Sequence, residues 1–150
     1  MVARLDVAGV RDCLCRIGDG GRMTPIPVTI TPFLSVVPQR STMDCAVACL
    51  AMFCGVSYEQ ALLASGAVLE KGMQTRKIQA TARRLGRPLK FCRTVDLETD
   101  TGLLAVRSVK WKHDHLVVLK EGLVVDTDAS LWDVDVFLAA YQATVLSILK

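Results

Sequence analysis

From Val37 to Phe53 the chain reads VPQRSTMDCAVACLAMF, which places an aspartate and a cysteine at the start of a long apolar run. Asp44 is a residue type that favours the N-cap of a helix, and Gly55 is placed to end one. The run therefore predicts a helix with Cys45 in its first turn, where unpaired backbone N–H groups stabilise an anion. Because the thiolate is the form of cysteine that attacks carbonyl carbon, Cys45 is a candidate nucleophile.

A structural role is the alternative for Cys45, since free cysteine is among the residue types most often buried. Cys49 lies one turn further along the predicted helix and Cys54 lies at its far end, so both are interpreted as core residues. The six cysteines are expected to be reduced thiols in a cytoplasmic protein, because the sequence has no pattern of a secretory signal. Neither the cysteines nor the histidines have the spacing of a zinc site, so we expect no metal and no cofactor.

Two further helices are expected after the first one. The tetrapeptide SYEQ at residues 57–60 is a capping box, which predicts a short helix through Ala64. A third helix is predicted from about Arg76 to Leu85, because Gly86 follows it as an end signal.

The pattern changes to β-branched or alternating runs beyond Pro88. Five runs divided by turn residues predict strands: LKFCRT, LLAVRSV, HLVVL, LVVD and ATVLSIL. The segment SLWDVDVFLAAY, residues 130–141, is predicted to be a helix before the last of these strands. Helices followed by mostly antiparallel strands indicate an α+β fold.

Length and composition predict a single globular domain over residues 1–150, with 51% hydrophobic and 22% charged residues. Residues 1–38 are expected to be a loop or extended N-terminal segment, with VTIT before Pro32 as a candidate edge strand, and residues 39–150 to form the core. The net charge of +3 is mild, and the basic residues are not gathered with aromatic residues, so no nucleic acid is expected as a partner. No segment approaches the roughly 20 apolar residues of a membrane span.

A histidine and an aspartate are predicted to meet across a hairpin. His115 begins the run HLVVL, which turns at KEG into LVVD. If residues 120–121 form the turn, His115 lies directly opposite Asp126; if residues 121–122 form it, Asp126 is diagonal to His115 and Asp128 is opposite. Asp126 neighbours His115 in both registers, and a carboxylate there would orient the imidazole as a base for a cysteine nucleophile.

Two more polar residues bear on this site. The other histidine, His113, is flanked by Lys112 and Asp114 and is expected to be solvated. Gln39 lies six residues before Cys45, and a side-chain amide together with a backbone N–H at a helix start can stabilise the oxyanion of acyl transfer. Without that role, a glutamine in a loop is expected at the surface.

Three segments of the chain resemble one family of enzymes. They are QRSTMDCAVACLAMFCGVSYEQALLASG, GMQTRKIQATARRLGRPLKF and HDHLVVLKEGLVVDTD. Together they are similar to the bacteriocin-processing (double-glycine) peptidase family, a branch of the papain-like cysteine peptidases, over residues 36–126. The resemblance implies a papain-like fold, with N-terminal helices packed on a mostly antiparallel C-terminal sheet. It also implies four roles: Cys45 as nucleophile, His115 as general base and acid, Asp126 as orienting acid and Gln39 as oxyanion donor.

The chain departs from the family pattern at two positions. Ala46 replaces the glycine after the nucleophile, and Thr127 replaces the proline after the acid. The expected function is a thiol hydrolase that cuts a peptide or amide bond in a peptide or protein substrate. The same residues would also serve a deamidase or transamidase. The alternative from another class is a catalytically silent papain-like module that binds a peptide or a protein.

Overall fold

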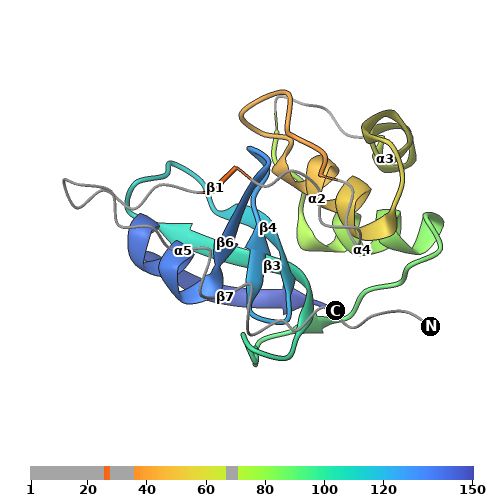
Figure 1. The fold of residues 1–150 in the computed structure, drawn as a ribbon. Helices are drawn as coiled ribbons and strands as arrows, with labels where there is room; N and C mark the ends of the chain where they lie inside the picture. The colour runs from red at the N-terminus through yellow and green to blue at the C-terminus, as the bar shows by residue number, and fades with distance from the viewer. Residues whose placement is uncertain (1–25, 28–35, 67–70) are drawn as a thin grey trace, which may run out of the picture.

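The computed structural model describes residues 26–27, 36–66 and 71–150. Within these residues it contains four helices and seven strands (Figure 1). In chain order they are β1 (Ile26–Pro27), α2 (Cys45–Cys54), α3 (Tyr58–Ser65), α4 (Thr75–Arg84), β2 (Phe91–Cys92), β3 (Thr101–Ser108), β4 (His115–Lys120), β5 (Leu123–Val125), β6 (Ser130–Asp133), α5 (Val134–Tyr141) and β7 (Ala143–Leu149). The protein therefore belongs to the α+β class, as the order of the sequence patterns predicts.

The described strands join one sheet in the order β1-β6-β5-β4-β3-β7-β2, and all neighbouring pairs are antiparallel. The two longest strands, β3 and β7, pair with each other next to β4. They approach closely at Gly102, where an added Cβ would lie 2.3 Å from the carbonyl oxygen of Leu149. Because that neighbour is backbone, only glycine fits at this position of β3.

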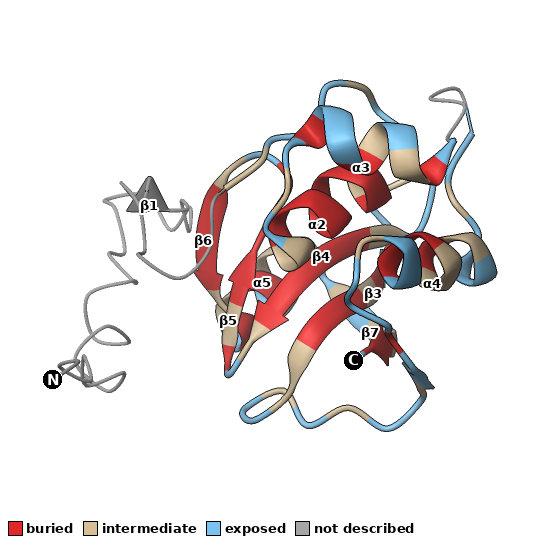
Figure 2. Ribbon diagram, turned by 90° about the vertical axis from the view of Figure 1, so that its right-hand side faces the viewer, coloured by how far each residue is buried: buried red, intermediate tan, exposed pale blue. Residues whose placement is uncertain are grey.

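Helices cover both faces of the sheet (Figure 1). One face packs against α2, α3 and α4, and the other packs against α5. Successive strand residues point to opposite faces, so Leu103 and Val118 join the first core while Leu104 and Val117 join the second. Since both faces are buried, the central strands are nearly continuous apolar runs instead of alternating ones (Figure 2).

The central helix of the first layer is α2, which packs against α3, α4 and β4. Its residues from Ala46 to Met52 are all buried, which explains why it is apolar on every side. Gly55 ends it in the left-handed region at φ 68°, as predicted. None of the described helices is by itself long and apolar enough to cross a membrane, although α2 and α3 pass that test as a pair bent by 115°.

The predicted capping box at the start of α3 is confirmed. The Ser57 hydroxyl accepts from the backbone N–H of Gln60, and the Gln60 side chain accepts from the backbone N–H of Ser57. The third predicted helix is α4, and its bounds differ from the predicted ones by one residue at each end.

The prediction of one helix over residues 130–141 is wrong. The first four residues form β6, and α5 begins only at Val134. Pairing with β5 and β1 imposes the strand, and such pairing is not visible in a local hydrophobic pattern. The boundary does have a local sign, because the Asp133 side chain caps α5 by accepting from the backbone N–H of Asp135 at 3.0 Å.

The N-terminal predictions are mostly outside the described residues. The expected VTIT edge strand (28–31) lies there, as do Cys13 and Cys15. The described dipeptide Ile26–Pro27 pairs with β6 at the edge of the sheet. The described cysteines are free thiols, as predicted: Cys45, Cys49, Cys54 and Cys92.

Candidate active site

The β4–β5 hairpin sets the positions of the histidine and the acid. It turns at Glu121 and Gly122, whose φ angles are 47° and 84°. Two successive residues with positive φ are typical of the type I′ turn, whose twist matches that of paired antiparallel strands. The structure thus has the second of the two predicted registers, in which Asp126 is diagonal to His115.

The side chains of His115 and Asp126 meet as predicted. Nε2 of His115 lies 2.7 Å from Oδ1 of Asp126, and only 19% and 8% of the two side chains are exposed. The same carboxylate oxygen accepts the backbone N–H of Thr127 at 2.6 Å. The other candidate acid, Asp128, is engaged elsewhere, since its Oδ1 accepts from the backbone N–H and the hydroxyl of Ser130. Asp126 is therefore the residue that orients the imidazole.

Packing of α2 on β4 brings the cysteine to the histidine. The Cys49 thiol donates to the carbonyl oxygen of Leu116 at 3.1 Å, which fixes the helix against the strand. Cys45 lies one turn before Cys49, and His115 lies one residue before Leu116. As a result, half-buried Cys45 lies near enough to His115 for its side chain and its charge to raise the pKa of the imidazole. Because Asp126 occupies Nε2, Nδ1 is the ring nitrogen that remains for a contact with Cys45.

The surroundings of His115 favour its protonated form. Burial lowers the pKa of the imidazole, but hydrogen bonds to Asp126 and Cys45 and the negative charges of both residues raise it to about 9. At neutral pH the site therefore holds an imidazolium between a carboxylate and the sulfur of Cys45. Such an imidazolium stabilises a neighbouring thiolate.

The thiol of Cys49 has the opposite character. Burial raises its pKa well above the usual value, and the negative charges of Cys45 and Asp126 add to this effect. Cys49 is also completely buried. It is thus an unreactive thiol that packs in the core, as predicted.

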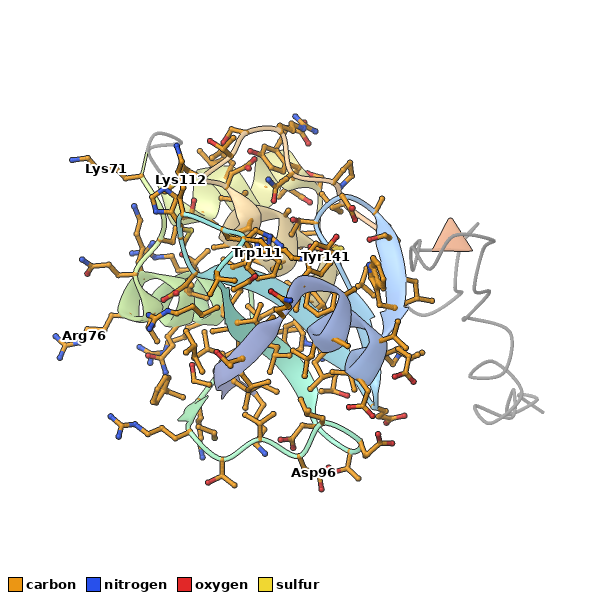
Figure 3. The ribbon with its side chains drawn as sticks, turned by 90° about the vertical axis from the view of Figure 1, so that its left-hand side faces the viewer. Lys71, Arg76, Asp96, Trp111, Lys112 and Tyr141 are labelled. Carbon is orange, nitrogen blue, oxygen red and sulfur yellow. The ribbon has the colours of Figure 1, made fainter. Side chains whose placement is uncertain are left out.

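An aromatic side chain covers the imidazole. The rings of Trp111 and His115 are 5.1 Å apart between centroids and tilted by 57°. Trp111 also packs against Tyr141 of α5, again with 5.1 Å between the centroids (Figure 3). This cover keeps water from part of the imidazole and so strengthens its hydrogen bonds.

Gln39 contacts Thr127, the residue that follows Asp126. Its backbone N–H donates to the carbonyl oxygen of Thr127 at 2.8 Å, and its side-chain oxygen accepts from the Thr127 hydroxyl. Its amide nitrogen donates to the carbonyl oxygen of Ser41 at 2.9 Å. The structure therefore bonds His115 to Asp126, brings Cys45 close enough to affect His115, and joins Gln39 to Asp126 through Thr127.

The carboxylate of Asp44 supports the loop between Gln39 and Cys45. Asp44 occupies the N-cap position of α2, as predicted. Its side chain, however, makes no capping hydrogen bond with the helix. It points back and accepts from the backbone N–H groups of Arg40 at 2.9 Å and Ser41 at 3.1 Å. This buried side chain therefore fixes the conformation of the loop instead of the helix end.

A tyrosine of α3 completes the environment of this carboxylate. The Tyr58 hydroxyl donates to Oδ2 of Asp44 at 2.5 Å. Burial raises the pKa of the Asp44 carboxyl, but the bonds from Tyr58 and from the loop N–H groups outweigh it, so the pKa lies below the usual value. Burial and the hydrogen bond to Asp44 raise the pKa of Tyr58 to about 12.

Three residues of this region were not assigned to the site from the sequence. Trp111 has no spacing motif, and its place near His115 depends on the loop between β3 and β4. Thr127 stood out only as a departure from the family pattern. Asp44 was assigned to helix capping, because the sequence shows the residue type and not the direction of its side chain.

No group of three or more His, Cys, Asp or Glu side chains within residues 36–66 and 71–150 could hold a metal ion. His113 is exposed, and its neighbour Asp114 forms an ion pair with Arg107 at 2.7 Å.

Comparison of the chain with protein-family models and with curated proteins finds no match. The chemistry of the site is therefore inferred from its own residues.

Proposed function

We propose that this protein is a papain-like thiol hydrolase that cleaves a peptide or amide bond. The observation that supports this proposal is the hydrogen bond between His115 and Asp126, with Cys45 near enough to raise the pKa of the same imidazole. A cysteine at a helix start, an imidazole and an orienting acid are the three groups that thiol acyl transfer requires. In this proposal the helices and sheet form a papain-like scaffold, with the nucleophile on α2 and the base and acid on the β4–β5 hairpin.

The proposed reaction begins with an ion pair between the Cys45 thiolate and the His115 imidazolium. The Cys45 thiolate attacks the carbonyl carbon of the substrate, and the new C–S bond leaves a negative charge on the carbonyl oxygen. The amide of Gln39 and the backbone N–H of Cys45 stabilise that oxyanion. His115 then donates its proton to the nitrogen of the leaving amine, and the C–N bond breaks.

Water completes the cycle. Neutral His115 takes a proton from a water molecule, which attacks the thioester carbonyl and forms a second oxyanion at the same donors. Collapse of this intermediate breaks the C–S bond and releases the carboxylic acid. The proton on His115 and the thiolate of Cys45 restore the starting ion pair.

The alanine after the nucleophile is compatible with this mechanism. Ala46 is only 3% exposed, so its methyl group packs in the core formed by α2 and the sheet. It therefore does not occupy the accessible side of Cys45, where a substrate would bind.

Selective alkylation tests the proposal. We expect iodoacetamide at mildly acidic pH to label Cys45 much faster than Cys49, whose burial keeps it protonated. The substitution His115→Gln should strongly slow the labelling of Cys45, because it removes the imidazolium, while buried Cys49 stays slow. Peptide mapping by mass spectrometry identifies the labelled residue in each case.

Turnover of a peptide library distinguishes the possible outcomes. A new amino terminus among the products supports peptide-bond cleavage, whereas release of ammonia with an intact backbone indicates deamidation instead. Slow and equal labelling of all thiols, with no turnover, contradicts the proposal and favours a peptide-binding module.

A further inference from the structure

We propose that Thr127 is a positioning residue, which orients the amide of Gln39 as an oxyanion donor and joins it to Asp126. The inference rests on the proposed function, because it concerns the donor of that reaction. Thr127 is 2% exposed and lies in the turn that follows Asp126. Its three polar groups all bond to these two residues: its carbonyl and hydroxyl to Gln39, and its N–H to Asp126.

The hydroxyl of Thr127 determines which way the Gln39 amide points. The carbonyl oxygen of Ser41 can only accept a hydrogen bond, so the amide nitrogen must face it. The amide oxygen consequently faces Thr127, whose hydroxyl donates to it. With both ends held, the second N–H of the amide has a fixed direction, and this N–H is the donor that the oxyanion would use.

The backbone N–H of Thr127 holds the orienting acid, Asp126. It donates to Oδ1 of Asp126 at 2.6 Å, the same atom that lies 2.7 Å from Nε2 of His115. The Thr127 hydroxyl is 3.4 Å from this oxygen, so its proton is committed to Gln39. One buried residue thus holds the oxyanion donor with its side chain and the orienting acid with its backbone.

The family that the sequence resembles has proline after the acid, and proline has neither an N–H nor a hydroxyl. Thr127 therefore supplies two hydrogen bonds that the residue of the family pattern could not make. Thr127, which stands in place of that proline, therefore joins Gln39 to Asp126.

Two reagents measure the oxyanion donor separately from the thiolate. Iodoacetamide alkylates Cys45 by displacement at a saturated carbon and forms no oxyanion. In contrast, p-nitrophenyl acetate acylates Cys45 through a tetrahedral oxyanion and releases p-nitrophenolate. The ratio of the two rate constants reports oxyanion stabilisation, and the variant Cys45→Ala gives the background from other thiols.

The substitution Thr127→Val keeps the shape and the N–H but removes the hydroxyl. We expect acylation to slow about 10- to 100-fold, since a displaced donor stabilises the oxyanion poorly. Alkylation should stay near the wild-type rate, and Thr127→Ser should restore acylation. Thr81→Val is the matched control, because Thr81 is also buried and its hydroxyl donates to the carbonyl oxygen of Lys77 within α4. Neither rate should change in that variant.

A double variant tests whether Thr127 acts through Gln39. If it does, Thr127→Val combined with Gln39→Ala acylates no more slowly than Gln39→Ala alone. An additive loss, or an equal fall of both rates in Thr127→Val, overturns the inference and leaves the proposed function standing. A wild-type chain that acylates no faster than the Cys45→Ala background overturns the proposed function and the inference with it.

Discussion

Nε2 of His115 lies 2.7 Å from Oδ1 of Asp126, although the two residues are diagonal neighbours in their hairpin. Val125 is the last residue of β5 that pairs with β4, so Asp126 stands where the chain leaves the sheet. There its side chain can turn toward the imidazole, and the N–H of Thr127 holds it in that position. The diagonal register thus allows a contact that fixes the orientation of the His115 ring and favours a proton on Nε2.

Removal of the orienting acid is the first prediction. In Asp126→Ala, His115 loses its orienting contact and a neighbouring charge, and acylation of Cys45 should fall by about 10²- to 10⁴-fold. Asp126→Asn should lose less, because the N–H of Thr127 keeps the amide oxygen directed at the imidazole. Asp128→Asn is the control and should acylate near the wild-type rate, since Asp128 bonds to Ser130. Equal losses in the two aspartate positions would contradict this assignment of the acid. The release of p-nitrophenolate measures the rate of Cys45 acylation in all three variants.

Tryptophan fluorescence gives a direct titration of His115. An imidazolium quenches a nearby indole, and Trp111 packs against this ring. In Trp132→Phe, which leaves Trp111 as the only tryptophan of the chain, emission should increase with pH around a midpoint near 9. The increase should be absent in His115→Gln made in the same background. A midpoint near the ordinary histidine value of 6.5 would show that Asp126 and Cys45 do not stabilise the imidazolium.

The same ionisation predicts how stability depends on pH. The folded-state pKa of His115 is about 9 and exceeds its ordinary value of 6.5, so the folded state binds the proton more tightly than the unfolded state. The resulting stabilisation is complete below pH 6.5 and is lost as the pH rises through 9. It amounts to roughly 3 kcal/mol at most.

Chemical denaturation of the wild type and of His115→Gln between these two pH values measures this contribution. Their difference in unfolding free energy should shrink as the pH rises. A difference that is constant with pH would argue against a protonated His115 in the folded state.

Local chemistry in the sequence predicted the helix ends and the hairpin. Gly55 ends α2 and Ser57 starts α3 because a left-handed residue and a capping box act within a few residues. The meeting of His115 with Asp126 was predictable for the same reason, since a short turn leaves only two registers. The class of fold followed from the order of helical and alternating patterns.

Features that depend on distant segments were not predictable in this way. The residues of β6 have a helical pattern, but β5 and β1 provide hydrogen-bond partners that make them a strand. The direction of the Asp44 side chain depends on Tyr58, which belongs to the next helix. The contacts of Thr127 depend on Gln39, which lies far away in the sequence. In each case the local pattern lacks the partner that decides the outcome.

The hydrogen bond from Tyr58 to Asp44 leads to a prediction on stability. The substitution Tyr58→Phe removes a donor from a buried carboxylate, and bonds to charged groups contribute about 1.5–3 kcal/mol to the free energy of unfolding. We expect a loss in this range at pH 7, measured by chemical denaturation. The loss should diminish in acid, because the pKa of Asp44 is lowered in the folded state, and the stabilisation is lost as the pH falls through that pKa.

Glu59→Gln is the control for the tyrosine variant. Glu59 pairs with Arg40 at 2.6 Å near the same loop, but both side chains are more than half exposed. Water screens such a pair, so its removal should leave the unfolding free energy unchanged within error. Acylation of Cys45 should also be little affected in Tyr58→Phe, because the carboxylate still accepts the N–H groups of Arg40 and Ser41. If Tyr58→Phe instead slowed acylation as strongly as Gln39→Ala, the tyrosine would hold the loop in its active form, and the two backbone bonds would not suffice.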